Sequence, residues 1–311
     1  MSYLNKTIFV MVPAYRDPVL RETLDSIFQN ALNPERVFVA IGAQYDNEIP
    51  MPDLTGLPSK NLRLLTIHPE NRPGVYRLRS ILNKLYAGED YYLSIDSHTF
   101  LAEGWDEELI RSLESFNDKK TVLQAYEPGS ILHKNGTMKY IHYQMSVSLD
   151  NEVNIPRLVM KDLIYKDLLE TEEMPVSDYV QAGMIFTRGT FADEIRWGEL
   201  WQNDQEEPFL SFEMFMLGWT SRLMVTQKVI NHEPDRYYET VYSSEPESHN
   251  RNFRDSWGIQ KDDLSVVCPK IFAAMISNSG PFKVLKAIKS PRDWWHSIGL
   301  EDEYEKYKDL F

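Results

Sequence analysis

The sequence predicts an α/β fold in which a mixed β-sheet is flanked by helices. In the first third, short apolar runs alternate with segments whose apolar residues recur at helical spacing. This alternation is typical of a sheet built from strand, helix and strand crossovers. The first three apolar runs are each followed by polar segments, YRD, QYD and PENRPG. Ligands bind at the carboxyl ends of strands in such sheets, so this edge is the expected site.

The first third is expected to hold four strands. The run TIFVMV (7–12) predicts the first, which we expect to end at Pro13 because proline lacks a backbone donor. A helix is expected over 18–32, where apolar residues from Val19 to Leu32 follow helical spacing. The remaining expected elements are strands over 36–46 and 62–68, a helix over 76–86, and a fourth strand, YYLSID, over 91–96.

The rest of the chain has a mixed pattern. WDEELIRSLESF (105–116) predicts an amphipathic helix, and TVLQAYEP (121–128) predicts a strand. Residues 133–180 are expected to be irregular, because NG and proline interrupt them. The further predictions are a strand over 182–189, a helix over 207–219 closed by Gly218, one strand over 221–234, and a helical tail from Ser290.

Composition limits the classes of function. Hydrophobic residues make up 42% of the chain, enough for a packed core, and the single cysteine, Cys268, excludes an intramolecular disulfide. The first apolar run is too short for a signal peptide, and no run reaches the ~18 residues needed to span a bilayer. We therefore expect a soluble, cytoplasmic protein. The formal net charge of -14 disfavours general binding to nucleic acid.

Asp96 and His98 stand two residues apart where the apolar run YYLSID meets a polar loop. Side chains at i and i+2 of a strand point the same way, so the two are expected to project together. A carboxylate beside an imidazole suits a divalent ion such as Mn2+. The alternative is an aspartate that caps the next turn beside a surface histidine. His232, in VINHEP, is either the third ligand or an ordinary loop residue.

The run NRPGVYRLRSILNKLYAGEDYYLSIDSHTFLAEGWDEELI resembles the centre of GT-A glycosyltransferases. It is most similar to the UDP-GlcNAc:polypeptide (hydroxyproline) N-acetylglucosaminyltransferase family. The chain departs from the family pattern at Val75, where proline is expected, and at Leu78, where alanine is expected. The positions that match in order are Gly74, Arg79, Glu89, Tyr91, Leu93, Asp96, Ser97, His98, Phe100, Trp105 and Asp106.

The resemblance extends over roughly residues 6–235 and implies a GT-A fold, a Rossmann-like nucleotide-binding sheet with an α-rich C-terminal extension. It implies a domain over 1–240, with a nucleotide-binding half (1–106) and an acceptor half (107–240). Residues 241–311 would then be a helical extension packed on the same domain. The implied activity is metal-dependent transfer of a sugar from a UDP-sugar to a hydroxyl acceptor, with retention of configuration. GlcNAc is the sugar that the resemblance favours, and a polypeptide is the acceptor that it favours.

The resemblance also implies the site residues. Mn2+ or Mg2+ would be held by Asp96, His98 and His232. Glu206 and Glu207 would lie at the reacting centre, although two acids before Pro208 are also what an ordinary helix start favours. The residues implied for the UDP-sugar are Pro13, Ala14, Tyr15, Arg16, Asp46, Asn71, Arg72, Arg79, Asp96 and Ser97.

Aromatic residues offer a further set of candidate contacts with uracil or sugar. Tyr15, Trp201 and Trp219 could present stacking faces, whereas the two tryptophans could equally serve as core residues.

Two alternatives remain at this stage. In one, the same chemistry acts on a glycan or on a hydroxymethylated DNA base, an acceptor that the acidic charge does not favour. In the other, the chain is a nucleotide-sugar-binding module without catalysis, since a fold does not determine a function.

Overall fold

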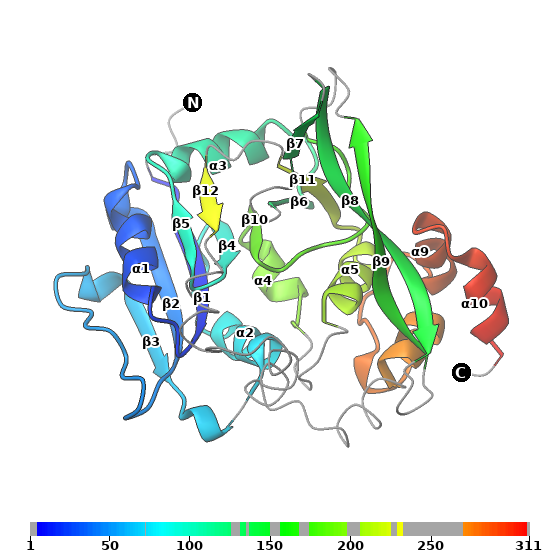
Figure 1. Cartoon of the computed structure of the whole chain (residues 1–311), viewed down its shortest axis with the longest axis horizontal. Coiled ribbons are helices and arrows are strands. Elements are labelled where there is room, and N and C mark those ends of the chain that lie inside the picture. The colour runs from blue at the N-terminus through cyan, green and yellow to red at the C-terminus, as the bar shows by residue number, and fades with distance from the viewer. Residues whose placement is uncertain are drawn as a thin grey trace.

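A computed structural model describes residues 5–71, 73–125, 131–134, 137–149, 156–167, 174–197, 206–224, 229–232 and 270–309. The central sheet has seven strands in the order β11-β6-β10-β4-β1-β2-β3 (Figure 1). Its strands are β1 (Ile8–Tyr15), β2 (Val37–Gln44), β3 (Leu62–Thr66), β4 (Tyr91–Ile95), β6 (Thr121–Gln124), β10 (Met184–Arg188) and β11 (Thr220–Leu223).

Two smaller sheets accompany the central one. The first pairs β5 (Thr99–Leu101) with β12 (Ile230–His232). The second has the order β7-β8-β9, with bounds β7 (Ile131–Lys134), β8 (Thr137–Leu149) and β9 (Pro156–Asp167).

The α-helices are α1 (Leu20–Gln29), α2 (Val75–Asn83), α3 (Trp105–Glu114), α4 (Thr190–Glu194), α5 (Glu206–Met216), α9 (Pro291–Ser297) and α10 (Glu301–Tyr307). Residues 270–277 are also helical. The short 3-10 turns are η1 (Pro34–Arg36), η2 (Ser59–Asn61), η3 (Pro69–Asn71) and η4 (Gly280–Phe282). Among the parts described, no helix is long and apolar enough to cross a membrane.

The central sheet is mixed, as the sequence predicts. β1 pairs in parallel with β2 and β4, and β2 pairs in parallel with β3, so the carboxyl ends of these four strands share one edge. β10 runs antiparallel between β4 and β6. The four predicted strands of the first third are confirmed, and so are the helices expected between them.

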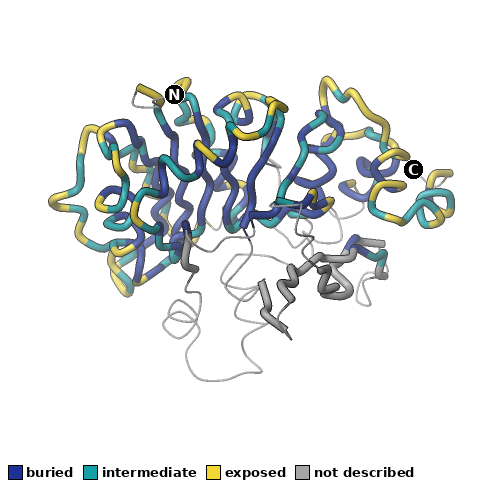
Figure 2. The backbone as a smooth tube through the Cα atoms, turned by 90° about the horizontal axis from the view of Figure 1, so that it is seen from above, coloured by how far each residue is buried: buried dark blue, intermediate teal, exposed yellow. Residues whose placement is uncertain are grey.

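The sheet separates two hydrophobic cores. Alternate residues of β1 face opposite sides, with Phe9 and Met11 in one core and Val10 and Val12 in the other. The first core includes apolar side chains of α2, α5, α9 and the 270–277 helix, whereas the second includes those of α1 and α3. Figure 2 shows the strands of the sheet as a largely buried layer. The edge of the sheet is therefore held rigidly from both sides.

β1 does not end at Pro13, contrary to the expectation from sequence. It continues to Tyr15, with Pro13 opposite Gly42 of β2. The ladder between β1 and β4 stops at Met11, so the missing N–H of Pro13 leaves no gap on that side. Leu32 also departs from its predicted helix, because α1 ends at Gln29 and Leu32 is 60% exposed.

The expectation of an irregular region over 133–180 is wrong. β8 and β9 form a long antiparallel pair there, and β7 pairs with β8 so that Lys134 lies opposite Thr137. An Asn-Gly dipeptide separates those two residues in sequence. Such a dipeptide can join two strands of a hairpin as well as interrupt regular structure.

The single strand expected over 221–234 is also wrong. That segment contributes two strands, β11 in the central sheet and β12 in the sheet with β5. Apolar residues alone do not show where a chain leaves one sheet for another.

Candidate active site

The Asp96–His98 segment lies at the carboxyl end of β4, on the edge where β1 and β2 also end. β4 stops at Ile95, so Asp96 and His98 belong to a turn between β4 and β5. The strand alternation that predicted a common direction for the two side chains does not govern this turn. Asp96 bonds to Arg79 from α2, whereas His98 bonds to Asp17 from the loop after β1.

Asp96 is held from two parts of the fold. Arg79 Nη2 donates to Asp96 Oδ1 at 2.6 Å and to the carbonyl of Ala182 at 3.0 Å. The backbone N–H of Asp96 donates to the carbonyl of Gly183 at 3.1 Å. Arg79 is only 2% exposed, so a buried guanidinium neutralises this carboxylate. The contact of Arg79 with a donor phosphate stays a prediction.

Asp17, which the sequence analysis did not select, lies directly behind Ser97 and His98. It is fully buried, and its Oδ2 accepts hydrogen bonds from Ser97 Oγ and from His98 Nδ1, the latter at 2.9 Å. Its Oδ1 accepts the backbone N–H of Val19 at 2.9 Å. Thr23 Oγ1 in α1 donates to the carbonyl of Ser97 at 2.6 Å, which fastens the same two loops a second time.

Glu207 lies in the first turn of α5, and its carboxylate binds the segment that leads into β10. Its Oε2 accepts the hydroxyl of Tyr179, and its Oε1 accepts the N–H of Ala182 at 3.0 Å. Burial raises the pKa of Glu207 above its ordinary value, while these two hydrogen bonds and the charge of Arg79 oppose the rise. Glu206 is the first residue of α5, partly buried beside it. The structure thus brings Glu207 to the Arg79–Asp96 pair.

The residues expected to contact uridine lie at the ends of β1 and β2. Pro13 and Ala14 are in β1, Tyr15 closes it, and Arg16 follows with a φ of +49°. Arg16 donates to Asp46, which also accepts two backbone N–H groups of its own turn at 3.0 Å. One of those N–H groups is the main cause that lowers the pKa of Asp46, and Arg16 adds to the effect. Base recognition by Asp46 stays a prediction.

The third proposed metal ligand approaches through the smaller sheet. β12 pairs with β5 so that His232 lies opposite Thr99, the residue next to His98. The side chain of His232 is outside the described part of the chain. Among the side chains that are described, no three from His, Cys, Asp and Glu are grouped so as to hold a metal ion. The oxygen and nitrogen donors of Asp96 and His98 fit Mn2+ or Mg2+ once a third ligand joins them.

The remaining residues predicted to contact the UDP-sugar are either exposed, buried in the core or outside the described part of the chain. Asn71 is exposed at the end of η3, and Arg72 lies outside the described residues, as does Trp201. Trp219 is 3% exposed and its indole N–H donates to Glu194 Oε2 at 2.9 Å, so it is a core residue.

The Trp105–Asp106 motif serves the fold. The indole of Trp105 donates to the carbonyl of Ile27 at 3.0 Å. Asp106 is fully buried, forms an ion pair with Arg36 at 3.0 Å and accepts two backbone N–H groups from the turn after α1.

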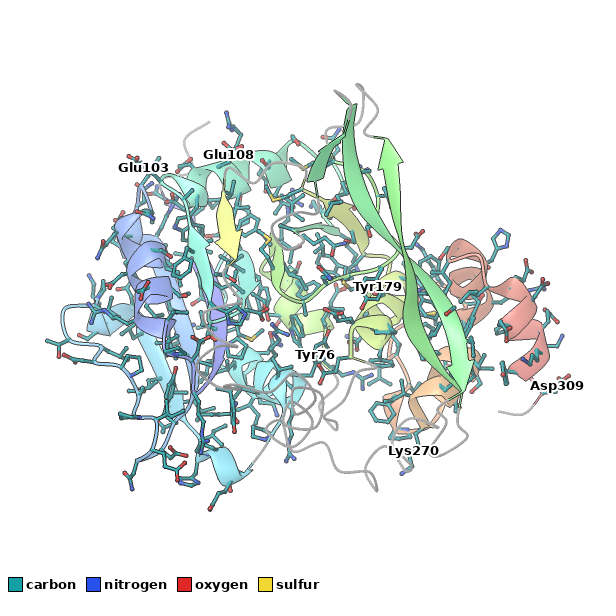
Figure 3. All side chains as sticks on the ribbon, in the orientation of Figure 1. Tyr76, Glu103, Glu108, Tyr179, Lys270 and Asp309 are labelled. Carbon is teal, nitrogen blue, oxygen red and sulfur yellow. The ribbon has the colours of Figure 1, made fainter. Side chains whose placement is uncertain are left out.

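Two tyrosines near the site were not expected from the sequence. Tyr179 is the partner of Glu207, and Tyr76 in α2 lies within electrostatic range of Glu207, Glu206 and Asp96. Both are near the middle of the molecule in Figure 3. The Tyr76 hydroxyl is buried and has no hydrogen-bond partner among the described residues. Tyr76 could have been noticed as the aromatic residue inside GVYRLRS, whereas Tyr179 carried no signal.

Comparisons with known proteins bear on the family and the fold. The family model described as Glycosyltransferase (GlcNAc) matches residues 7–70 and 52–254 of the 311. The crystal structure of GalNAc-T7 with UDP, GalNAc and Mn2+ has a TM-score of 0.56 and 14% identity, over 96% of this chain and 57% of that one. The chain therefore spans little more than half of that protein, and the likeness shows the fold.

A second solved structure is S. aureus TarS 1-349, with a TM-score of 0.47, 11% identity, and coverage of 96% of this chain and 80% of that one. Its complex with UDP-GlcNAc gives a TM-score of 0.47 and 12% identity, with 96% and 81% coverage. No curated protein sequence matches the chain significantly. Because the family model extends over well more than half of the sequence, the chain belongs to the Glycosyltransferase (GlcNAc) family and is a glycosyltransferase with a GT-A α/β fold.

Proposed function

We propose that this enzyme transfers GlcNAc from UDP-GlcNAc to a hydroxyl group on a polypeptide, in a metal-dependent reaction that retains the anomeric configuration. The family description supports the sugar, and the resemblance to polypeptide N-acetylglucosaminyltransferases supports the acceptor and the retention. The related fold of GalNAc-T7, solved with UDP and Mn2+, supports the nucleotide and the ion.

The observation that most supports this proposal is the pairing of β5 with β12. The β5·β12 ladder places His232 opposite Thr99, next to the Asp96–His98 turn, although more than a hundred residues separate the strands in sequence. Asp96, His98 and His232 would hold the divalent ion. Bound there, the ion would stabilise the negative charge that develops on the departing UDP.

The protein's own groups would prepare this site. Arg79 would keep Asp96 in place, because its buried guanidinium forms an ion pair with the carboxylate at 2.6 Å. Glu207 fixes Ala182, whose carbonyl accepts from Arg79, and Gly183 accepts from the Asp96 backbone. We therefore assign Glu207 the role of positioning the site, with Glu206 beside it at the start of α5, and no covalent glycosyl intermediate is required.

The test is UDP release from a panel of UDP-sugars with Mn2+ or with chelator. For Asp96→Asn we expect a rate lower by about two orders of magnitude, because charge stabilisation of this kind is worth several kcal/mol. Asp25→Asn is the matched control: Asp25 and Asp96 side chains are both 28% exposed and both pair with an arginine, but Asp25 lies on α1. Its rate should stay close to that of the unmodified enzyme.

Melting temperatures are measured beside the rates, since Asp96→Asn also removes the partner of a buried Arg79. UDP release that persists in chelator would contradict the metal site. Turnover of other UDP-sugars but not UDP-GlcNAc would contradict the proposed donor and leave the enzyme class intact. Product NMR with peptide, glycan and hydroxymethylated DNA acceptors identifies the acceptor and the anomer.

A further inference from the structure

Asp17 is a carboxylate at this edge of the sheet that belongs neither to the residues expected to bind uridine nor to the proposed metal ligands. It is fully buried, and no lysine or arginine within the described ranges pairs with it. Its charge is compensated by hydrogen bonds from Ser97 Oγ, His98 Nδ1 and the backbone N–H of Val19. A buried carboxylate needs such donors, so each of these three groups is held in a defined orientation.

The bond to His98 determines where the proton lies on the ring. Asp17 Oδ2 accepts the hydroxyl of Ser97, and a carboxylate oxygen acts as an acceptor toward His98 as well, so His98 Nδ1 carries the hydrogen of this contact and donates it. In a neutral imidazole the lone pair is then on Nε2, the nitrogen on the opposite side of the ring. That is the tautomer needed for a metal bond through Nε2.

We propose that Asp17 is a positioning residue that fixes His98 as the Nδ1–H tautomer, the form in which Nε2 could serve as a metal ligand. This inference rests on the proposed metal site. A histidine that binds a metal commonly donates its other ring N–H to a carboxylate, which orients the ring and strengthens it as a ligand.

The surrounding contacts support a prepared site. The carbonyl of Asp17 accepts the hydroxyl of Tyr45 at 2.8 Å, and Thr23 on α1 bonds to the carbonyl of Ser97. The loop after β1 and the turn after β4 are therefore locked together around the Asp17–His98 pair. His98 is only 13% exposed as a side chain, so the ring has little room to turn.

Asp17→Asn separates this role from a structural one. Asparagine can still accept the Val19 N–H through its oxygen, which preserves the turn. Its amide would, however, face His98 as a donor, so the ring would present its lone pair at Nδ1 and carry the proton on Nε2. The proposed site would then lose one of its two nitrogen ligands even though its shape is kept.

The first measurement is Mn2+ affinity by electron paramagnetic resonance, without any donor sugar. We expect Asp17→Asn to weaken binding by about 10- to 100-fold, and Asp25→Asn to leave it unchanged. If the unmodified protein binds no Mn2+, the proposed metal site fails. If it binds Mn2+ and Asp17→Asn binds equally well, the proposed function stands and the role of Asp17 is overturned.

The second measurement needs no altered Asp17 and therefore does not depend on how that variant folds. Long-range 1H–15N spectra distinguish the two histidine tautomers, and the signal of His98 is identified among the seven histidines by its loss in His98→Gln. The Nδ1–H tautomer is expected in the metal-free protein. Observation of the Nε2–H tautomer would overturn the proposal.

Discussion

At the scale of single residues, Tyr76 and Tyr179 differ in the hydrogen bonding of their hydroxyl groups. Tyr179 donates to Glu207. The Tyr76 hydroxyl is buried, at 1% residue exposure, and no residue in the described part of the chain forms a hydrogen bond with it. Burial and the carboxylates of Glu207 and Glu206 raise the pKa of Tyr76 well above its ordinary value, so its hydroxyl remains a donor. Such a group costs stability when nothing is bound beside it.

These environments predict opposite effects of removing each hydroxyl. Tyr76→Phe should raise the free energy of unfolding by up to about 1 kcal/mol, since no hydrogen bond is lost. Tyr179→Phe should lower it by about 2 kcal/mol, because a bond to a carboxylate is lost. Urea unfolding of the two variants measures both values. Destabilisation of Tyr76→Phe as large as that of Tyr179→Phe would contradict this account.

Glu207 makes stability depend on pH in a defined direction. Its pKa is raised in the folded protein, so folding is favoured most when pH is below the unfolded pKa, and this advantage is lost as pH rises through the folded pKa. Relative to Glu207→Gln, the unmodified protein should therefore lose free energy of unfolding between about pH 4 and neutral pH. Urea titrations across that range test this, and a relative gain with rising pH would refute it.

At the scale of elements, the site depends on segments held together by buried polar contacts. α3 is tied to the turn after α1 through Asp106, which accepts the N–H groups of Leu32 and Asn33 at 2.9 and 3.1 Å. Asp106 also pairs with Arg36, which is 4% exposed. The Trp105–Asp106 part of the family pattern thus connects α3 to the turn after α1. We expect changes in it to lower the stability of the fold and to leave metal binding unchanged.

Asp106→Asn should lower the free energy of unfolding by at least about 2 kcal/mol, because it leaves a buried guanidinium with a weaker partner. Glu107, which accepts from Arg36 at 2.7 Å, limits the loss. Glu107→Gln is the matched control, since its carboxylate is 30% exposed and its effect should be smaller. Folded Asp106→Asn should bind Mn2+ as the unmodified protein does, and a selective loss of metal would contradict the structural role.

At the scale of the whole molecule, the strand order gathers residues that are remote in sequence. β4 lies between β1 and β10. The turn after β4 therefore bonds through His98 to Asp17, which follows β1, and through the Asp96 N–H to Gly183, which precedes β10. α5 adds Glu207 through Ala182. The formal net charge of -14 makes the protein acidic on average, which bears on the class of acceptor.

That charge predicts weak interaction with DNA. Phosphate contacts supply most non-specific affinity, and an acidic protein gains few of them. We expect no retention on a hydroxymethylated duplex at low salt and little sugar transfer to it, compared with peptide acceptors. Fluorescence anisotropy across a salt series measures the binding. Tight binding that weakens steeply with salt would instead indicate a basic groove and a nucleic-acid acceptor.

Sequence predicted elements well where one pattern dominated. The apolar runs at β1, β2 and β4 and the helical spacing of α2 and α3 led to the correct elements, because burial on a sheet or on one helix face imposes a regular period. The errors arose where competing signals met, as in the Asn-Gly hairpin before β8 and in the break between β11 and β12. Their outcome depends on pairing with strands elsewhere in the chain.

The sequence by itself determined the α/β class, the glycosyltransferase resemblance and the Asp96–His98 pair, because these lie within one continuous run of motif residues. Only the tertiary structure decided that Asp17 stands behind His98, that Arg79 holds Asp96, and that β12 brings His232 beside them. Hydrogen bonds and strand pairing join residues across distances in sequence that no local period can encode. Burial then makes each of these contacts costly to break.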